Sequence, residues 1–203
     1  MKNNLDAFDQ HLHKLLVIMA NEGIHNAARG ISGMVGETVI VSRPVVRRIP
    51  ITEIPSLLGS PETEAVGIYL RADGDIASQI MMVVPYHYAL ELVDMMMGYT
   101  PGTTQHLGTL ERSALAELGN LTGTFFLNAV ATTTGLGARP SPPAVMVDMV
   151  GAILDIILAT SATGLSESVL MVQATFLRGD REAEVDFWVI PDRTTLEAVA
   201  RRD

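Results

Sequence analysis

The chain has 203 residues, of which 48% are hydrophobic and 18% are charged, so it is long and apolar enough to bury a sizeable core. Its net charge of −9 argues against a general nucleic-acid binder, which needs clustered lysine and arginine to displace counterions. The chain contains no cysteine, which excludes disulfides, thiolate metal sites and cysteine nucleophiles.

The sequence of the first half of the chain predicts a helix, a strand, a hairpin and a second helix. Apolar residues recur at nearly helical spacing within residues 5–34, and a valine-rich stretch typical of a strand follows at Glu37–Arg48. Two strand-like runs, Ala65–Arg71 and Ile76–Val84, are joined by a Gly-Asp pair, which indicates a hairpin. A proline then opens a helix at Tyr86–Met97, because proline suits the first helical turn.

The second half repeats this order of elements. Helical spacing of apolar residues predicts a helix over residues 110–135, and a proline-broken strand follows near Ala138–Val147. A second Gly-Asp pair joins the strand-like runs Ser168–Leu177 and Ala183–Ile190. A proline again opens a helix, at Asp192–Arg201.

The matching order indicates that one unit has been duplicated. We expect a single domain over residues 1–203, made of two repeats at about 5–98 and 107–202, with a Gly-, Thr- and Pro-rich link at Gly98–His106. The expected fold is α+β and pseudo-two-fold, with a mostly antiparallel sheet flanked by long helices. Both halves should share one sheet, because a lone hairpin is only marginally stable.

A spacing that occurs twice marks a candidate site. Asn120 is followed by Pro143 with 22 residues between them, and Asn21 is followed by Pro44 with the same 22. An isolated Glu-x2-Asn pair would be better explained as an ordinary exposed helix face. The repeated spacing favours a site instead, because it indicates that a shared architecture places the asparagine and the proline.

Two further polar residues precede the second asparagine. Ser113, Glu117 and Asn120 stand at i, i+4 and i+7, so a helix places all three on one face. Gly119 is a poor helix former, and in an ordinary exposed polar helix it would allow close packing.

The full pattern resembles that of the CheC/CheX/FliY family of chemotaxis phosphatases, which carry Asp/Ser-x3-Glu-x2-Asn-x22-Pro. The flanking segments are also similar to the family's: ERSALAELGNLTGTFFLNAVATTTGL and PSPPAVMVDMVGAILD. The resemblance covers essentially the whole chain, and the duplicated layout resembles CheC more than the single-site CheX. It implies a hydrolase that removes the aspartyl phosphate of CheY-phosphate, a response regulator of two-component signalling.

The resemblance also implies a role for each residue of the pattern. Asn120 would orient the attacking water, since a carboxamide offers both a donor and an acceptor. Glu117 would dock the regulator by pairing with a lysine, and Ser113 and Pro143 would support the site. The chain should need no cofactor of its own, because Mg²⁺ would be held by the CheY substrate.

The first copy of the site lacks two of these side chains. Asn21 and Pro44 remain, but Lys14 and Ile18 stand where the second copy has serine and glutamate. Lys14 would repel the regulator's lysine, and Glu22 lies about 100° around the helix from Asn21, so it cannot take the missing role. We expect this degenerate first site to be inactive.

Other functions stay open. The chain could be a non-catalytic module that binds CheY-phosphate or CheD, or a flagellar-switch adaptor like FliY and FliM. Because the sequence ends soon after its last expected helix, we expect a free-standing CheC-like protein. A small-ligand-binding α+β domain is a weaker alternative, since no phosphate-binding glycine loop is present. The resemblance places a CheD-binding region near Asp148, where an ordinary structural helix is the alternative.

Location and partners follow from the same features. The N-terminal residues lack the apolar core of a signal peptide, and the apolar runs are too short to span a bilayer. We therefore expect a cytoplasmic protein that binds neither membrane nor nucleic acid. The histidines lack metal-ligand spacing, so no metal site is expected. The internal two-fold repeat is compatible with a monomer.

Overall fold

The computed structural model describes residues 17, 21–42, 45–50, 53–57, 59–75, 77–160 and 168–191. Within that part, a first helix occupies residues 21–35. The other elements are, in chain order, β1 (Ile40–Val41), β2 (Val45–Pro50), α2 (Ile54–Leu57), β3 (Glu64–Gly74), β4 (Ser78–Pro85), α3 (Tyr86–Met97), α4 (Thr109–Thr134), β5 (Ala138–Pro140), β6 (Ala144–Met149), α5 (Val150–Thr160), β7 (Ser168–Arg178) and β8 (Arg181–Pro191). The helix predicted at Asp192–Arg201 and most of the chain before residue 21 lie outside the described residues.

The strands form one 8-stranded sheet in the order β1-β7-β8-β4-β3-β5, in which β2 also pairs with β7 and β6 also pairs with β3. Every described pairing is antiparallel. The centre of the sheet is the pair β4 and β8, where Met82 lies opposite Phe187. Outward from this pair come β3 on one side and β7 on the other, and then the short strands of each half. The expected pseudo-two-fold α+β fold with one shared sheet is confirmed; the exact limits of the two repeats stay a prediction.

Both predicted hairpins are present. The strands β7 and β8 are joined by the two-residue turn Gly179-Asp180, in which Gly179 has φ 65°, a value that favours glycine. The strands β3 and β4 pair from Ala65 with Pro85 to Ala72 with Ser78. The helix predicted after the first hairpin, Tyr86–Met97, is α3 with the same bounds. Pro85 is both the last residue of β4 and the N-cap of this helix.

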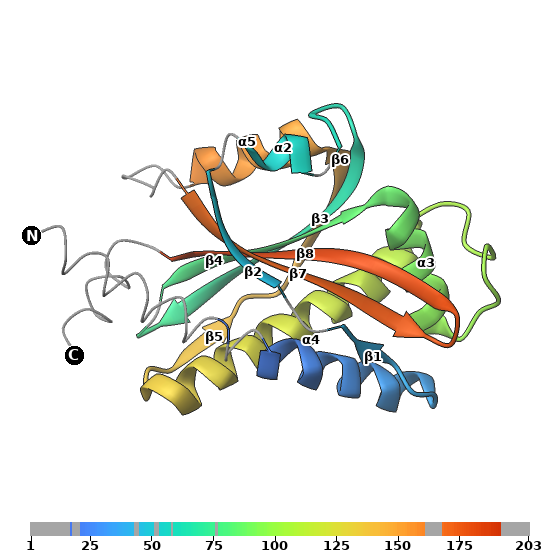
Figure 1. Ribbon diagram of the computed structural model, residues 1–203, viewed down its shortest axis with the longest axis horizontal. Helices are drawn as coiled ribbons and strands as arrows, with labels where there is room; N and C mark the ends of the chain where they lie inside the picture. The colour runs from blue at the N-terminus through green and yellow to red at the C-terminus, as the bar shows by residue number, and fades with distance from the viewer. Residues whose placement is uncertain are drawn as a thin grey trace, which may run out of the picture.

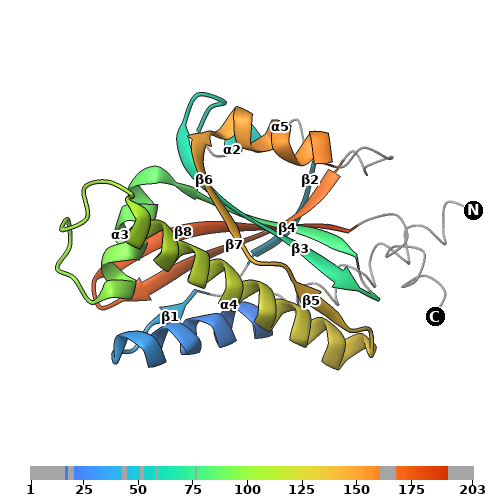
Figure 2. The same cartoon turned by 180° about the vertical axis from the view of Figure 1, so that it is seen from behind.

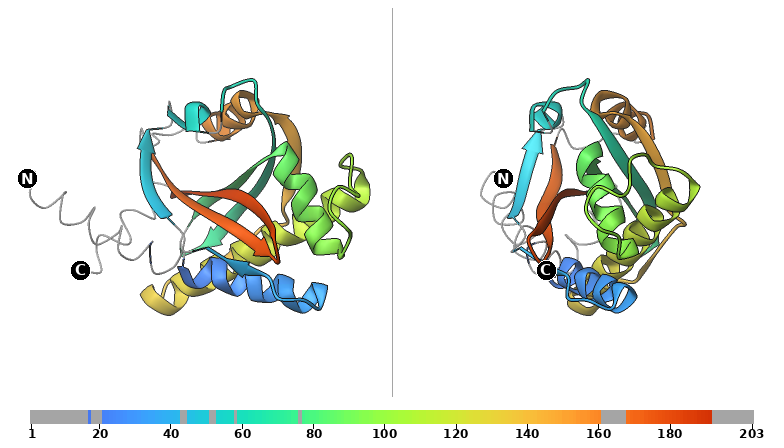
Figure 3. Two further views of the ribbon diagram at one scale, coloured as in Figure 1. Left: turned by 45° about the vertical axis from the view of Figure 1, so that its right-hand side comes forward. Right: turned by 90° about the vertical axis from the view of Figure 1, so that its right-hand side faces the viewer.

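Helices cover the sheet on both sides. Figure 1 shows α2 and α5 on one side, and α4 with the helix of residues 21–35 on the other. Figure 2 shows α3 beside the start of α4, at the end of the sheet where β7 turns into β8. The sheet is strongly curled, and α2 and α5 lie across its open side (Figure 3).

The core is divided in two by the sheet. Neighbouring residues of a strand face opposite ways, so Met82 joins the larger cluster under α3 and α4 while Met81 joins the smaller cluster under α2 and α5. Both methionines are fully buried. Burial on both faces explains why β4 reads as a continuous apolar run and not as an alternating one.

Candidate functional site

The helix α4 carries the candidate site and lies directly on β3. Gly119 is buried, and a Cβ added to it would lie only 2.5 Å from Cγ2 of Ile68 on β3. One turn later, a Cβ added to Gly123 would lie 3.3 Å from Cδ2 of Leu70. The two glycines therefore let the helix backbone approach the sheet closely, and Gly119 sets the height of its neighbour Asn120 above it.

The three polar residues of the pattern lie on the outward side of α4. Ser113 is exposed and Glu117 and Asn120 are half-buried, whereas Leu115 and Leu118 are buried. Among the residues that the structure describes, the side chains of Ser113, Glu117 and Asn120 form no hydrogen bond or salt bridge with one another or with a neighbour. The carboxylate and the amide are thus available to a partner.

Pro143 lies on the edge of the sheet next to this helix. It belongs to the three residues between β5 and β6, where Ser141 donates its backbone N–H to Arg71 O at 2.7 Å and accepts the Arg71 N–H on Oγ at 3.0 Å. Val145, two residues later, pairs with Ile68, the residue against which Gly119 packs. Both β5 and β6 contact α4. Asn120 and Pro143 therefore lie on neighbouring elements that are both fixed to β3.

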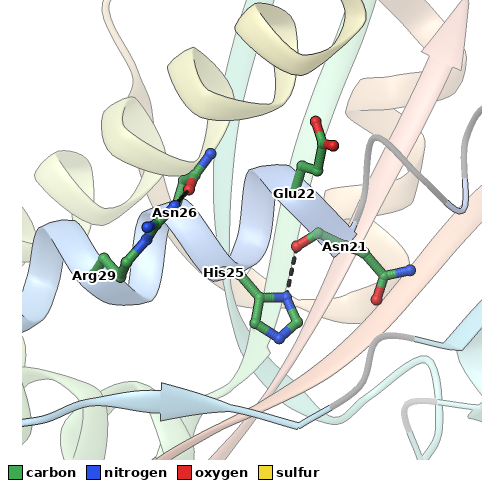
Figure 4. A pocket seen from close by; sticks show the side chains of 5 residues that line it. All are labelled: Asn21, Glu22, His25, Asn26 and Arg29. Carbon is green, nitrogen blue, oxygen red and sulfur yellow. Dashed lines mark hydrogen bonds between the residues drawn. The ribbon is translucent and has the colours of Figure 1, made fainter. Parts of the chain in front are cut away.

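The first copy of the site is arranged differently. Asn21 Nδ2 donates a hydrogen bond to Val17 O at 2.7 Å, so its amide donor is used within its own helix. Glu22 points to a different side of the helix from Asn21 (Figure 4). Lys14, Ile18 and Pro44 lie outside the described residues.

The sequence analysis did not predict the shallow surface depression that adjoins Asn21. It is lined by polar residues of this one helix: Asn21, Glu22, His25, Asn26 and Arg29 (Figure 4). His25 Nδ1 lies 2.6 Å from Asn21 O, and Arg29 is hydrogen-bonded to the Asn26 side chain. The spacing of these residues, opposite the buried Ile24 and Ile31, is the signal that could have indicated a common polar face.

The two asparagines lie at different levels of a helix pair. A Cβ added to Gly23 would be 2.9 Å from Phe126 Cα, and one added to Gly30 would be 3.4 Å from Phe125 and 3.6 Å from Leu121. The contacts run in opposite order along the two helices, so the helices are antiparallel. The surface beside Asn21 is consequently separate from the surface beside Asn120.

Asp148 is exposed at the end of β6, where it lies opposite Ala65 of β3. Its Oδ1 accepts the N–H of Met149 at 2.8 Å, and α5 begins at the next residue. Asp148 therefore ends a strand, while the segment after it, from Val150, is the structural helix of the alternative interpretation. It lies beside α5, away from the polar face of α4.

A buried carboxyl group lies apart from the candidate site. Asp186 on β8 is only 2% exposed, and its Oδ1 has no hydrogen-bond partner among the described residues. Burial, reinforced by the charge of Glu184, raises the pKa of Asp186 from 3.8 to about 7, although a hydrogen bond from Gln173 and the charge of Arg47 oppose the rise. Sequence reasoning missed this group, because alternate acidic residues on a strand normally indicate a solvated face.

The described residues contain no group of three or more histidine and carboxylate side chains placed to hold a metal ion. None of their helices is both long and apolar enough to cross a membrane.

The comparisons with known proteins agree with one another. No family model matches the chain. It is 24% identical over 182 residues to the CheY-P phosphatase CheC of Bacillus subtilis (strain 168), covering 88% of this chain and 87% of that protein. Thermotoga maritima FliY has a similar structure, with a TM-score of 0.71 and 17% identity over 94% of this chain and 96% of FliY.

Two other solved structures share the fold. The middle domain of FliM from H. pylori matches with a TM-score of 0.67 and 10% identity over 93% of this chain and 96% of that one. CheX of Borrelia burgdorferi, solved in complex with CheY, BeF3 and Mg²⁺, matches with a TM-score of 0.51 and 15% identity over 85% of this chain and 97% of that one. The chain is therefore similar in sequence to CheC and shares its fold with FliY, CheX and FliM.

Proposed function

We propose that this chain is a phosphatase that hydrolyses the aspartyl phosphate of CheY-phosphate on the outward face of α4. The observation that carries the proposal is the trio of Ser113, Glu117 and Asn120 on that face, whose side chains have no partner among the described residues. The similarity to CheC, which is itself a CheY-P phosphatase, supplies the substrate. A protein acting on CheY would work in the cytoplasm.

The proposed reaction requires the enzyme only to position a water molecule. An acyl phosphate is already activated, and Mg²⁺ on the regulator would neutralise the charge that develops at phosphorus. Asn120 accepts a hydrogen bond from a water and donates one to it, which holds the water in line with phosphorus. The water oxygen bonds to phosphorus as the bond to the aspartyl oxygen breaks. Inorganic phosphate and a free carboxylate are released.

Binding and support fall to the other residues. Glu117, whose carboxylate has no partner among the described residues, pairs with a lysine of the regulator and fixes its position along α4. Ser113 offers a hydrogen bond one turn earlier. Pro143 limits the site beside Asn120, and the two hydrogen bonds between Ser141 and Arg71 hold its segment in place.

The test follows the decay of CheY labelled with acetyl phosphate. Wild type should accelerate the decay, and Asn120→Ala should abolish the acceleration while leaving binding intact. Glu117→Ala should weaken binding. Asn128→Ala is the matched control, because Asn128 is an exposed asparagine two turns further along the same helix. If the Asn120→Ala variant still accelerates decay at saturating substrate, the role proposed for Asn120 is wrong.

The second candidate function is a non-catalytic adaptor that binds CheY-phosphate or CheD, or acts in a flagellar switch. The structural similarity to FliY and FliM favours it. The same assay separates the two functions, because an adaptor would bind CheY-phosphate and leave its decay unchanged. The assay is repeated with CheD, and the exposed Asp148 is our proposed contact for that partner.

A further inference from the structure

The polar face of α4 continues into an exposed apolar side chain. Leu110, in the first turn of the helix, is 55% exposed. Leu110, Ser113 and Glu117 stand at i, i+3 and i+7, so they form one stripe along the helix. A partner seated on Ser113 and Glu117 would therefore also meet the aliphatic side chain of Leu110.

A second exposed apolar side chain lies on the neighbouring helix, at the level of the site. Gly30 packs against Leu121, and the two helices are antiparallel. One turn after Gly30 is Met34, and one turn before Leu121 is Glu117, so the packing brings Met34 level with Glu117. Met34 is also 55% exposed. A Cβ added to the adjacent Gly33 would meet nothing within 4 Å, which shows that this helix end is open to solvent.

We propose that Leu110 and Met34 form an apolar rim around Glu117 and Asn120 that binds the phosphorylated response regulator and sets its affinity. The inference rests on the proposed function, since it names further contacts for the same partner. The rim lies at the end of the stripe and across the helix pair, while Asn120 and Glu117 form the polar centre. This division predicts that the rim residues change binding and leave the chemical step alone.

The choice of partner comes from the chemistry of the whole face. The face offers a carboxylate for a cation, a free carboxamide for a bound water, and aliphatic groups on two sides. A folded domain that presents a lysine beside an acyl phosphate, with apolar surface around both, satisfies all three. A membrane is a poorer partner for this face, because Glu117 and the net charge of −9 would repel an anionic lipid surface.

The experiment measures the kinetics of CheY-phosphate hydrolysis for Leu110→Ala and Met34→Ala. Each variant should raise KM by roughly fivefold to tenfold, because each loses a few methylene groups of partly buried area. The value of kcat should stay within about twofold of wild type. Leu57→Ala is the matched control, since Leu57 on α2 is 46% exposed and lies on the other side of the sheet (Figure 1).

A binding assay separates this inference from the proposed function. Fluorescence anisotropy with CheY carrying beryllofluoride and Mg²⁺ should show the same roughly fivefold to tenfold weakening for both rim variants and none for Leu57→Ala. Weakened binding in a protein that shows no hydrolysis would support the rim and overturn the phosphatase. Unchanged affinity in both rim variants, or a loss confined to kcat, would overturn the rim.

Discussion

Asp186 should make the stability of this protein fall as pH rises toward neutrality. The carboxyl group lies on β8 opposite Gln173 of β7 and Val83 of β4, with Glu184 two residues away on the same face. Burial holds its pKa at about 7 in the folded protein, against 3.8 ordinarily. Below pH 3.8 the carboxyl is protonated in both states, so its full contribution to stability is present.

The magnitude follows from the two pKa values. Between 3.8 and about 7 the unfolded chain releases the proton while the folded chain keeps it, so the free energy of unfolding declines with pH. The total decline is about 4 kcal/mol, from a difference of about three pH units at about 1.4 kcal/mol each. Of this, about 2 kcal/mol falls between pH 5 and pH 7 and about 3 kcal/mol between pH 5 and pH 8, since the folded-state carboxyl is only half ionised at its pKa of about 7. Above about pH 8 the contribution is constant.

The assay is urea unfolding of wild type and Asp186→Asn at a series of pH values from 5 to 8. The variant has no carboxyl group to titrate at this position. The free energy of unfolding of wild type should therefore fall by about 3 kcal/mol relative to that of the variant between pH 5 and pH 8. Histidines and the other carboxylates cancel in the comparison, because both proteins contain them. Glu182→Gln, which removes an exposed charge from the same strand, should run parallel to wild type. A constant difference between wild type and Asp186→Asn from pH 5 to pH 8 would refute the reasoning.

Three further predictions concern packing and the two asparagines. Gly119→Ala should lower the free energy of unfolding in urea by about 1–3 kcal/mol, and it should slow CheY-phosphate decay by moving Asn120 away from the sheet. Gly123→Ala should lower the free energy of unfolding less. Equal losses in the two variants would contradict the close approach of α4 at Gly119. Asn21→Ala should leave the decay unchanged, since its amide is bonded within its own helix; a large loss would show an active first site. Asp94→Ala should lower stability by about 2–4 kcal/mol and speed proteolysis after α3, because three hydrogen bonds from the following segment end on that carboxylate.

Elements with strong local signals were predictable from the sequence. The Gly-Asp pairs marked both hairpins, and Pro85 and Gly98 bounded α3 at both ends. The division between β6 and α5 was not predictable in detail, because the apolar run from Val145 to Thr160 continues across it and Gly151 lies inside the helix, not before it. Tertiary contacts decide the change there: β6 pairs with β3 as far as Met149, and the next two residues donate their N–H groups to the turn before β3.

The candidate site was predictable as a pattern and not as a set of contacts. Helical periodicity alone placed Ser113, Glu117 and Asn120 on one face. The different states of the two asparagine amides depend on side-chain conformation, which no spacing encodes. The burial of Asp186 was also hidden, since it depends on strands from both halves packing around it.

The pairing of β4 with β8 has a consequence for the ancestry of the fold. These two strands come from different halves, yet they exchange hydrogen bonds along the centre of the sheet. A single unit, standing alone, would leave that strand as a long unprotected edge with apolar faces, which invites association. An ancestor with one copy of the unit would therefore have existed as a homodimer, and gene fusion would have turned its intermolecular seam into the interior of one polypeptide. Once fused, the two copies no longer had to be identical, so one half was free to lose residues that a symmetric pair would have had to keep.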